Sequence, residues 1–133
     1  SCPHRLVILL DENIAEAQRD RLQKWKPSIK QIGYDISRKG IEDSDIDPFI
    51  LSLPTPTLLT RDRGFYRRKF CHRKYGLVFL DVHPNDVAFD AIPFLRHVAF
   101  NTNKKRIGKV VRVSASGISM WVLREMRELH VQW

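Results

Sequence analysis

The sequence predicts an α/β fold with a mainly parallel central sheet, flanking helices in three layers and a β-hairpin near the C-terminus. Three short runs carry this prediction, because each has the length of a strand and each is followed by an acid. They are residues 6–10, followed by Asp11, residues 57–60, followed by Arg61 and Asp62, and residues 77–80, followed by Asp81. Apolar runs of this length are typical of strands that are buried on both faces, as in a parallel sheet.

The first helix is expected directly after the first strand. Asn13 has the side chain of an N-cap, and Glu16 three residues later completes a capping box. Pro27 ends this helix. The stripe that should face the core comprises Ile14, Ala17, Gln18, Leu22 and Trp25. A second strand is expected within residues 28–36, which completes a strand-helix-strand unit with a right-handed crossover.

A second helix is predicted over residues 44–53, where apolar residues recur at spacings of three and four. Its start is open. Pro48 at the first helical position favours Asp47 as the cap, whereas a start one turn earlier makes Asp43 or Ser44 the cap. Acids in a first helical turn also suit the helix dipole, so their presence does not by itself indicate a functional site.

The C-terminal part should contain one more helix and a hairpin. Pro84 opens the helix, and Pro93 kinks or restarts it. The residues expected to face the core are Val87, Ala88, Ala91, Leu95 and Val98. Residues 109–113 and 118–122 are predicted to pair as a hairpin at one edge of the sheet, and residues 123–129 to form a short helical turn.

Composition favours a single soluble domain. The chain has 133 residues, of which 43% are hydrophobic and 29% charged. We expect a core over about residues 5–100 and a hairpin extension over about residues 101–133. No apolar run approaches the length of a membrane span, and two cysteines make no disulfide framework, so a cytoplasmic protein with no membrane contact is expected. The spacings of Cys2, His4, Cys71 and His72 match none of the usual structural zinc patterns.

Net charge indicates an anionic partner. Lys and Arg number 23 against 15 Asp and Glu, for a net charge of +8 and a pI near 9.9, which favours nucleic acid as the partner. The basic residues concentrate between residues 61 and 74, where Asp62 is the one acid. They are Arg61, Arg63, Arg67, Arg68, Lys69, Arg73 and Lys74.

The acids at the strand ends predict a metal site. If the strands that precede Asp11 and Asp62 are parallel and central, both acids emerge at the same edge of the sheet, where open α/β sheets bind ligands. Hard divalent cations take oxygen ligands. A site for Mg²⁺ or Mn²⁺ at this edge is therefore expected.

Three motifs together resemble the PIN-like superfamily, in particular a small bacterial branch that opens with a leucine-leucine-aspartate-glutamate-asparagine motif. They are Ile-Leu-Leu-Asp-Glu-Asn at residues 8–13, Gly-x-x-Asp-Ser-Asp-Ile at residues 40–46 and Leu-Thr-Arg-Asp-x-Gly-Phe at residues 59–65. The resemblance covers about residues 5–82. It implies a Rossmann-like fold and a metal-dependent ribonuclease, which in many members is a toxin paired with a small antitoxin protein.

The resemblance also implies a set of site residues. Asp11, Asp43 and Asp62 match the metal-binding and catalytic acids of the family motifs, with Asp45 close enough to Asp43 to compete for its role. Thr60 matches the hydroxyl residue before the third acid and is expected to orient the attacking water. Weaker metal candidates are Glu12, Asp45 and Asp81. Asp81 is the sole plausible fourth acid, so the number of metal ions, one or two, is left open.

Basic and aromatic side chains are expected to hold single-stranded RNA. The RNA-binding candidates are Arg61, Arg63, Arg67, Arg68 and Lys69. A solvated helix face is the alternative for the last three. Phe65, Tyr66 or Tyr75 could stack a base, with core packing as the alternative, favoured for Phe65.

The late apolar residues predict an interface. A homodimer or a small protein partner would cover these side chains, which otherwise pack back onto the sheet. They are Ile118, Met120, Trp121, Val122 and Trp133.

Two other functions remain open. A PIN-like module that binds nucleic acid or protein without catalysis is favoured by the missing fourth acid and disfavoured by the three acids retained. A receiver-like domain phosphorylated on Asp62 is disfavoured, because residues 77–80 end in Asp81 where such a domain needs a lysine.

Overall fold

The computed structural model describes residues 8–34 and 55–133. The predicted helix over residues 44–53, with its cap candidates and with Asp43 and Asp45, lies outside the described residues. So do Cys2 and His4.

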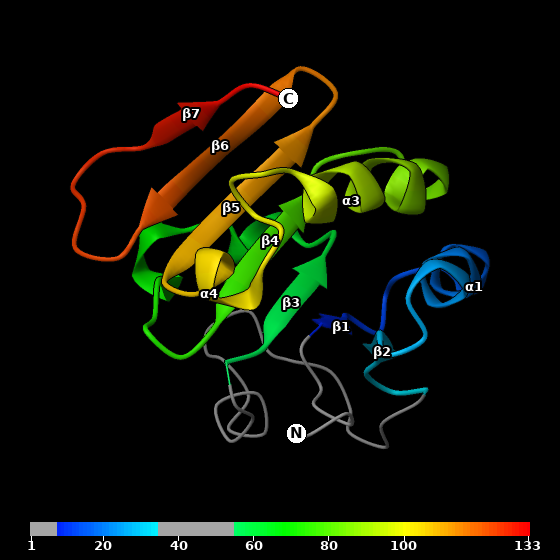
Figure 1. Ribbon diagram of the computed structural model, residues 1–133. Coiled ribbons are helices and arrows are strands. Elements are labelled where there is room, and N and C mark those ends of the chain that lie inside the picture. The colour runs from blue at the N-terminus through cyan, green and yellow to red at the C-terminus, as the bar shows by residue number, and fades with distance from the viewer. Residues whose placement is uncertain (1–7, 35–54) are drawn as a thin grey trace.

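A 7-stranded sheet forms the centre of the described part of the chain, in the order β2-β1-β3-β4-β5-β6-β7. Four of the pairings, from β2 through β5, are parallel, and β6 and β7 add antiparallel strands. The strands are β1 (Ile8–Leu10), β2 (Lys30–Gln31), β3 (Thr57–Thr60), β4 (Gly76–Leu80), β5 (Lys109–Ser114), β6 (Gly117–Val122) and β7 (Leu129–Val131). The predicted α/β class, the mainly parallel sheet and the C-terminal hairpin are confirmed (Figure 1).

Helical elements connect these strands. The α-helices are α1 (Glu16–Trp25), α3 (Val87–Arg96) and α4 (Asn103–Arg106), and the short 3₁₀ turns are η1 (Arg63–Phe65), η2 (Arg68–Phe70) and η3 (Pro84–Asp86). No helix among the described residues is long and apolar enough to cross a membrane.

The carboxyl ends of the central strands meet at one edge of the sheet, as the sequence predicts. Leu10 of β1 pairs with Leu59 of β3, and Thr60 of β3 pairs with Phe79 of β4, all in parallel. Since strands in parallel register end together, the acids that follow them share this edge. We call it the acid edge, and it comprises Asp11, Asp62 and Asp81.

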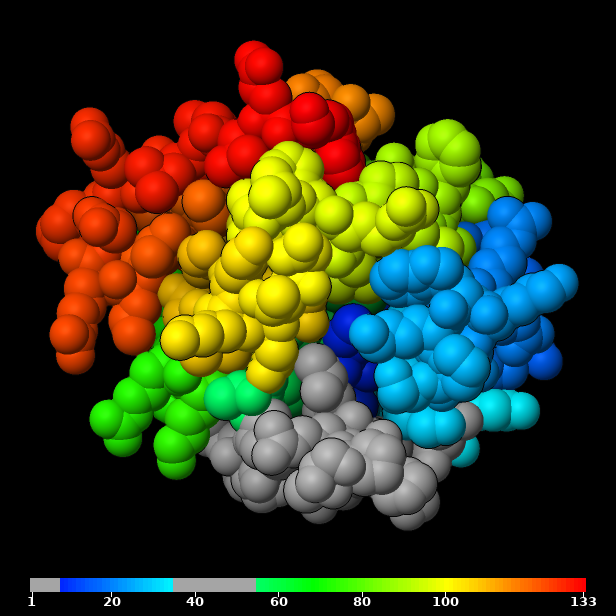
Figure 2. Space-filling view, in the orientation of Figure 1, coloured from blue at the N-terminus to red at the C-terminus, as the bar shows by residue number. Residues whose placement is uncertain are grey.

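Each face of the sheet has its own core. On one face α1 and α3 pack against the strands, with Leu22, Phe94 and Phe100 fully buried. Figure 2 shows this face, with α1 in blue and α3 and α4 in yellow-green to gold lying over the sheet. On the other face the connection from β3 to β4, which carries η1 and η2, packs Phe65 and Phe70 against Leu58 and Leu77.

Helix α1 departs from the predicted stripe and cap. It begins at Glu16 with Ala15 at the cap position, and no side chain caps it there. Asn13 is exposed, because the turn after β1 is closed by the Ile14 N–H donating to the Asp11 carbonyl oxygen at 3.1 Å, and Ile14 enters the core.

The buried face of α1 is also different. Gln18 and Leu22 are buried as predicted, whereas Ala17 and Trp25 are exposed and Arg19 is buried in addition. Both polar residues have tertiary hydrogen-bond partners: Gln18 Oε1 accepts from the Ala88 N–H at 2.9 Å, and Arg19 donates to Gln31. Hydrogen bonds across elements therefore override the apolar pattern.

Three further predictions are corrected. β2 covers only Lys30–Gln31 of the expected segment. Helix α3 continues through Pro93, which is exposed, and Val98 lies beyond its end and is 73% exposed instead of facing the core. Residues 123–128, part of the segment predicted as a short helical turn, contain turns and bends but no helix. Residues 129–131 form β7, so the hairpin grows into three antiparallel strands.

Candidate functional site

Asp11 is the most enclosed acid of the acid edge. Its side chain follows β1 and is 6% exposed, and its Oδ2 accepts a hydrogen bond of 2.8 Å from Thr60 Oγ1. Burial raises the pKa of Asp11 above its ordinary value of 3.8, against the hydrogen bonds from Thr60 and the Glu12 backbone. The charges of Glu12 and Asp62 raise this pKa further, so the carboxylate of Asp11 favours a compensating cation.

Thr60 links Asp11 to the loop that carries Asp62. The Thr60 side chain is fully buried at the end of β3, and its Oγ1 accepts from the Asp62 backbone N–H at 3.0 Å. Asp62 Oδ1 in turn accepts from the Gly64 N–H at 2.8 Å, which caps η1. One hydroxyl therefore joins the two predicted metal ligands from neighbouring strands.

Asp81 differs from these two acids in its charge partners. Arg112 Nη2 lies 2.6 Å from Asp81 Oδ2, and Arg63 Nη2 lies 3.6 Å from Oδ1. Within the described ranges, neither Asp11 nor Asp62 has an ion pair with a basic side chain. Among the residues that the structure describes, the negative charge of Asp81 is thus matched by arginines, while Asp11 and Asp62 have no such partner.

The donor atoms at this edge fit a hard divalent cation. Asp11 and Asp62 offer carboxylate oxygens, the ligand type that Mg²⁺ and Mn²⁺ take. No arginine of residues 8–34 and 55–133 pairs with either carboxylate. No group of three potential metal-binding side chains occurs within residues 8–34 and 55–133. Glu12 is exposed, and the other expected ligand, Asp43 or Asp45, lies outside these ranges.

Gln31 is a site residue that sequence reasoning missed. It is buried in β2, next to β1, and its Nε2 donates to the carbonyl oxygens of Asp11 at 3.0 Å and Ile14 at 2.7 Å, with a longer contact to that of Glu12 at 3.4 Å. Its Oε1 accepts from Arg19 Nη1 at 3.2 Å. Gln31 therefore holds the turn that presents Asp11, and a polar residue between Ile29 and Ile32 was the available signal.

Arg61 and Arg63 lie at the acid edge and have protein partners. Arg61 donates from Nε and Nη2 to the Val82 carbonyl oxygen at 3.2 and 3.0 Å, which ties together the segments that follow β3 and β4. Arg63 pairs with Asp81 and lies over the Phe79 ring, 5.4 Å from its centroid. Arg63 remains largely exposed, so one side of its guanidinium faces solvent.

The rest of the basic run is exposed and extends away from the acid edge. Arg68 Nη2 contacts Met126 Sδ at 3.2 Å, and Lys69 Nζ lies 5.1 Å from the centroid of the Phe70 ring. Arg68 and Lys69 border a hollow with Val122, the last residue of β6, and Leu123, which follows it. Although Asp62 lies within the basic run in the sequence, Arg68 and Lys69 of this run lie at the hollow with Val122 and not around Asp62.

The aromatic candidates are mostly structural. Phe65 and Tyr75 are buried in the core. For Phe65 this confirms core packing, which the sequence favoured over base stacking. Tyr66 is half-buried, and its hydroxyl bonds Ser119 Oγ at 2.9 Å and the Glu128 carboxylate. Burial, together with the bond to Glu128, raises the pKa of Tyr66.

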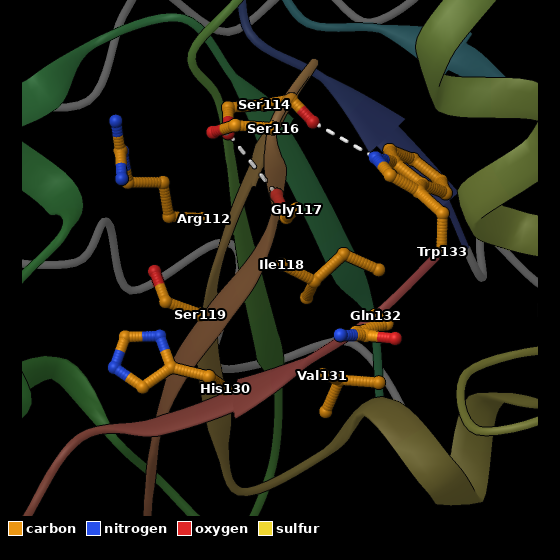
Figure 3. Close-up of a pocket in the computed structure, with 10 residues that line it drawn as sticks. All are labelled: Arg112, Ser114, Ser116, Gly117, Ile118, Ser119, His130, Val131, Gln132 and Trp133. Atoms are coloured by element: carbon orange, nitrogen blue, oxygen red, sulfur yellow. Dashed lines mark hydrogen bonds between the residues drawn. The ribbon is translucent and has the colours of Figure 1, made fainter.

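A polar hollow of about 640 Å³ lies beside the acid edge, over β5, β6 and β7. Arg112, Ser119 and His130 occupy one register row and point to the same side of the strands, away from Ile118 and Val131 (Figure 3). Trp133 closes the far end, where its Nε1 donates to the Ser114 carbonyl oxygen at 2.9 Å. Since Asp81 already matches the charge of Arg112, this hollow offers a phosphate little unmatched positive charge.

No family model, no curated protein and no solved structure matches this sequence.

Proposed function

We propose that this protein is a metal-dependent ribonuclease of the PIN-like type, which hydrolyses phosphodiester bonds of single-stranded RNA at the acid edge. The observation that carries the proposal is the Asp11–Thr60–Asp62 linkage. It joins two acids at the ends of adjacent parallel strands, and neither acid has a basic partner within the described ranges. The resemblance of the motifs at residues 8–13, 40–46 and 59–65 supports the same activity.

Each side chain has a role in this mechanism. Asp11 and Asp62 hold the cation, with Asp43 or Asp45 as a further ligand, and Glu12 and Asp81 are the weaker candidates. When bound, Mg²⁺ or Mn²⁺ supplies an activated water and neutralises charge on the phosphate and leaving oxygen. Thr60 donates a hydrogen bond to Asp11 Oδ2, which orients this carboxylate. The sequence predicted that Thr60 orients the attacking water, but its hydroxyl is fully buried and bonded to Asp11 and to the Asp62 N–H, so we assign it the positioning of these two acids instead.

Basic residues bind the RNA backbone. Arg61 and Arg63 lie nearest the acids, and Arg67, Arg68 and Lys69 continue along the same connection. The net charge of +8 supports a polyanionic substrate. A small antitoxin protein or a second copy of the chain is the proposed protein partner.

A noncatalytic PIN-like binding module is the second candidate. It is favoured by the ion pairs of Asp81 with Arg112 and Arg63, because these occupy the sole candidate for a fourth acid. In that case the acid edge would bind nucleic acid or protein without hydrolysing a bond.

The variant Asp62→Asn separates the two candidates. An Asn oxygen can still accept the Gly64 N–H, so η1 keeps its cap while the charged metal ligand is lost. We expect Asp62→Asn to abolish cleavage of labelled single-stranded RNA in Mn²⁺ and to leave RNA affinity equal or higher. Glu125→Gln, which removes an exposed acid outside the acid edge, should cleave as the parent does.

Two results would contradict the nuclease. Equal cleavage by Asp62→Asn and the parent, in preparations free of contaminating nuclease, would rule out catalysis at this site. RNA binding by the parent without any Mn²⁺-dependent cleavage would favour the noncatalytic module.

A further inference from the structure

We propose that the RNA is held at two places, the acid edge and a basic hollow at the opposite end of the sheet, so that binding depends on RNA length. This inference rests on the proposed function for its first place only. The basic hollow comprises Arg68, Lys69, Cys71, Val122, Leu123 and Arg124, and has a volume of about 440 Å³.

Strand pairing places the basic hollow away from the acids. β6 runs antiparallel to β5, so Val122 at the end of β6 lies opposite Lys109 at the start of β5. Val110, the next residue of β5, pairs with Leu77 near the start of β4. The hollow therefore lies where the parallel strands begin, whereas the acid edge lies where they end. In Figure 1 the strand arrows of β4 and β6 point to these two opposite ends.

Exposed cations line this hollow and adjoin its lining residues along the chain. Arg67 precedes Arg68, Arg73 and Lys74 follow Cys71 by two and three residues, and Arg127 follows Arg124 by three. In the described part of the chain, neither these four residues nor the three cations that line the hollow form an ion pair with a carboxylate.

The acids nearby leave this field positive. Glu125 and Glu128 lie in the segment between β6 and β7, and the Glu128 carboxylate already accepts from the Tyr66 hydroxyl, with His130 Nε2 at 4.0 Å from its other oxygen. Among the described residues, two acids, Glu125 and Glu128, therefore stand against seven exposed cations that line the hollow or adjoin it along the chain. A strongly basic surface of this kind attracts the phosphates of a nucleic acid.

One covering segment connects the two places. It leaves the acid edge at Asp62, crosses the face of the sheet as η1 and η2, and reaches the hollow at Arg68 and Lys69. Exposed Arg63 and Arg67 lie between these ends along the chain. Since a strand rises about 3.3 Å per residue and β4 has 5 residues, the two places are separated by roughly 17 Å. A single RNA strand can span that distance along the basic segment.

The floor of the hollow suits a single strand. Val122, Leu123 and Cys71 are half-buried and supply apolar surface between the cations. Proteins that bind single strands without sequence preference combine cations for the backbone with aromatic side chains on which bases stack. Within the described residues, the lining of this hollow holds no aromatic ring, so its apolar side chains offer the bases van der Waals contact and its cations hold the backbone. We therefore infer that the hollow binds nucleotides that lie several positions along the RNA from the cleaved bond.

RNA length tests the inference. Labelled RNAs of about 4 to about 16 nucleotides, a range typical of single-strand-binding sites, are bound to the parent and to the triple variant Arg68→Ala, Lys69→Ala and Arg124→Ala. In the parent, affinity should rise steeply once the RNA reaches both places. In the triple variant this rise should be lost, while the shortest RNAs bind as they do to the parent.

Salt dependence measures the contacts. If each of the three cations touches one phosphate, the slope of log affinity against log salt should fall by roughly 2 on the longer RNAs, at about 0.7 per contact. The matched control removes three exposed cations from α1 and its end, as Arg21→Ala, Lys24→Ala and Lys26→Ala. It should retain the length effect and most of the salt slope. Thermal unfolding confirms that both variants fold.

The outcomes separate this inference from the nuclease. Normal binding of long RNA by the folded triple variant would show that the basic hollow does not bind RNA. An equal loss of RNA affinity in the α1 control would also contradict the inference, because it would show that net charge alone sets the affinity. If the triple variant loses the length effect but Asp62→Asn still cleaves RNA as fast as the parent, the basic hollow is supported as an RNA-binding site and the proposed nuclease activity at the acid edge is contradicted.

Discussion

At the residue scale, the acid edge depends on where each carboxylate obtains its hydrogen bonds and charges. Asp81 is matched by two arginines, whereas Asp11 is buried with a threonine hydroxyl and two nearby acids. Metal-free Asp11 should therefore destabilise the fold, and a bound cation should remove that penalty.

Asp11→Asn should stabilise the metal-free protein near neutral pH. Burial raises the pKa of Asp11 in the folded state, so its stabilising contribution is present at low pH and is lost as the pH rises through the folded pKa. The Asn oxygen can still accept from Thr60. In EDTA the variant should melt above the parent at pH 7, and the difference should shrink as the pH falls toward 4. Thermal unfolding measures both.

Mn²⁺ gives the matched readout for Asp11. Ligands that bind only the folded state raise its stability by mass action, so Mn²⁺ should raise the midpoint of the parent and leave Asp11→Asn unchanged. If Asp11→Asn melts below the parent in EDTA at pH 7, the buried carboxylate of Asp11 does not destabilise the metal-free fold.

Gln31→Ala should loosen the turn that carries Asp11. It removes the donor to the buried carbonyl oxygens of Asp11 and Ile14 and the acceptor for Arg19. A buried polar group left without a partner costs about 1–3 kcal/mol, so we expect a loss of about 2 kcal/mol or more in the free energy of unfolding. Denaturant unfolding measures this, with the exposed Gln132→Ala as the control.

The position of Gln31 has a second readout. If it positions Asp11, the folded Gln31→Ala protein should need more Mn²⁺ for half of the thermal stabilisation that the parent gains. An unchanged Mn²⁺ requirement would limit Gln31 to a role in stability.

At the element scale, apolar runs predicted β1, β3 and β4 well, because strands buried on both faces need only a continuous apolar sequence. The assignment of α1 was less accurate: Gln18 and Leu22 are buried as predicted, but Ala17 and Trp25 are exposed, and Arg19 is buried by its bond to Gln31 in another element. β7 was missed because its pairing with β6 depends on the preceding hairpin. Local pattern does not reveal partners of this kind.

Gly76→Ala should disturb the start of β4. A methyl group there would lie 2.5 Å from the Arg106 backbone oxygen, so the chain before β5 must move. Arg106 is buried, and its Nε donates to Thr57 Oγ1 at 2.9 Å and its Nη1 to the Phe100 carbonyl oxygen at 2.8 Å. We expect a loss of about 1–3 kcal/mol, measured by denaturant unfolding. Ala115→Ser, in the exposed turn after β5, should change stability little. A Gly76→Ala protein as stable as the parent would contradict this close approach.

At the scale of the whole molecule, the charges divide between two ends of one sheet. We propose that the end with Asp11 and Asp62 binds a cation and that the end with the basic hollow binds phosphates; one end carries a buried carboxylate with a raised pKa, and the other is lined by three exposed cations. RNA that spans both ends would bring its phosphates toward the acids despite their negative charge.

Self-association is the prediction that concerns the outer strands. Ile118 and Met120 are buried in the sheet, as the alternative reading expected, but Met126 is 74% and Trp133 44% exposed. A second copy that covers these side chains would give a dimer. Light scattering at micromolar concentration should then show twice the monomer mass, and Met126→Lys should restore the monomer. A parent that is strictly monomeric would remove self-association and leave a small protein partner as the proposal.

The α/β class, the central strands and the shared edge of Asp11 and Asp62 could be predicted from the sequence alone. A strand buried on both faces is a short continuous apolar run, and the residue that ends the run marks the end of the strand. Tertiary structure decided which acids keep an unmatched charge. Arg112 reaches Asp81 because β5 lies beside β4, a pairing between residues far apart in the chain. The same long-range register carries Arg68 and Lys69 to the end of β6, away from Asp62, and brings Gln31 under the turn after β1. Such partners follow from the order of strands in space, which no local pattern of residues specifies.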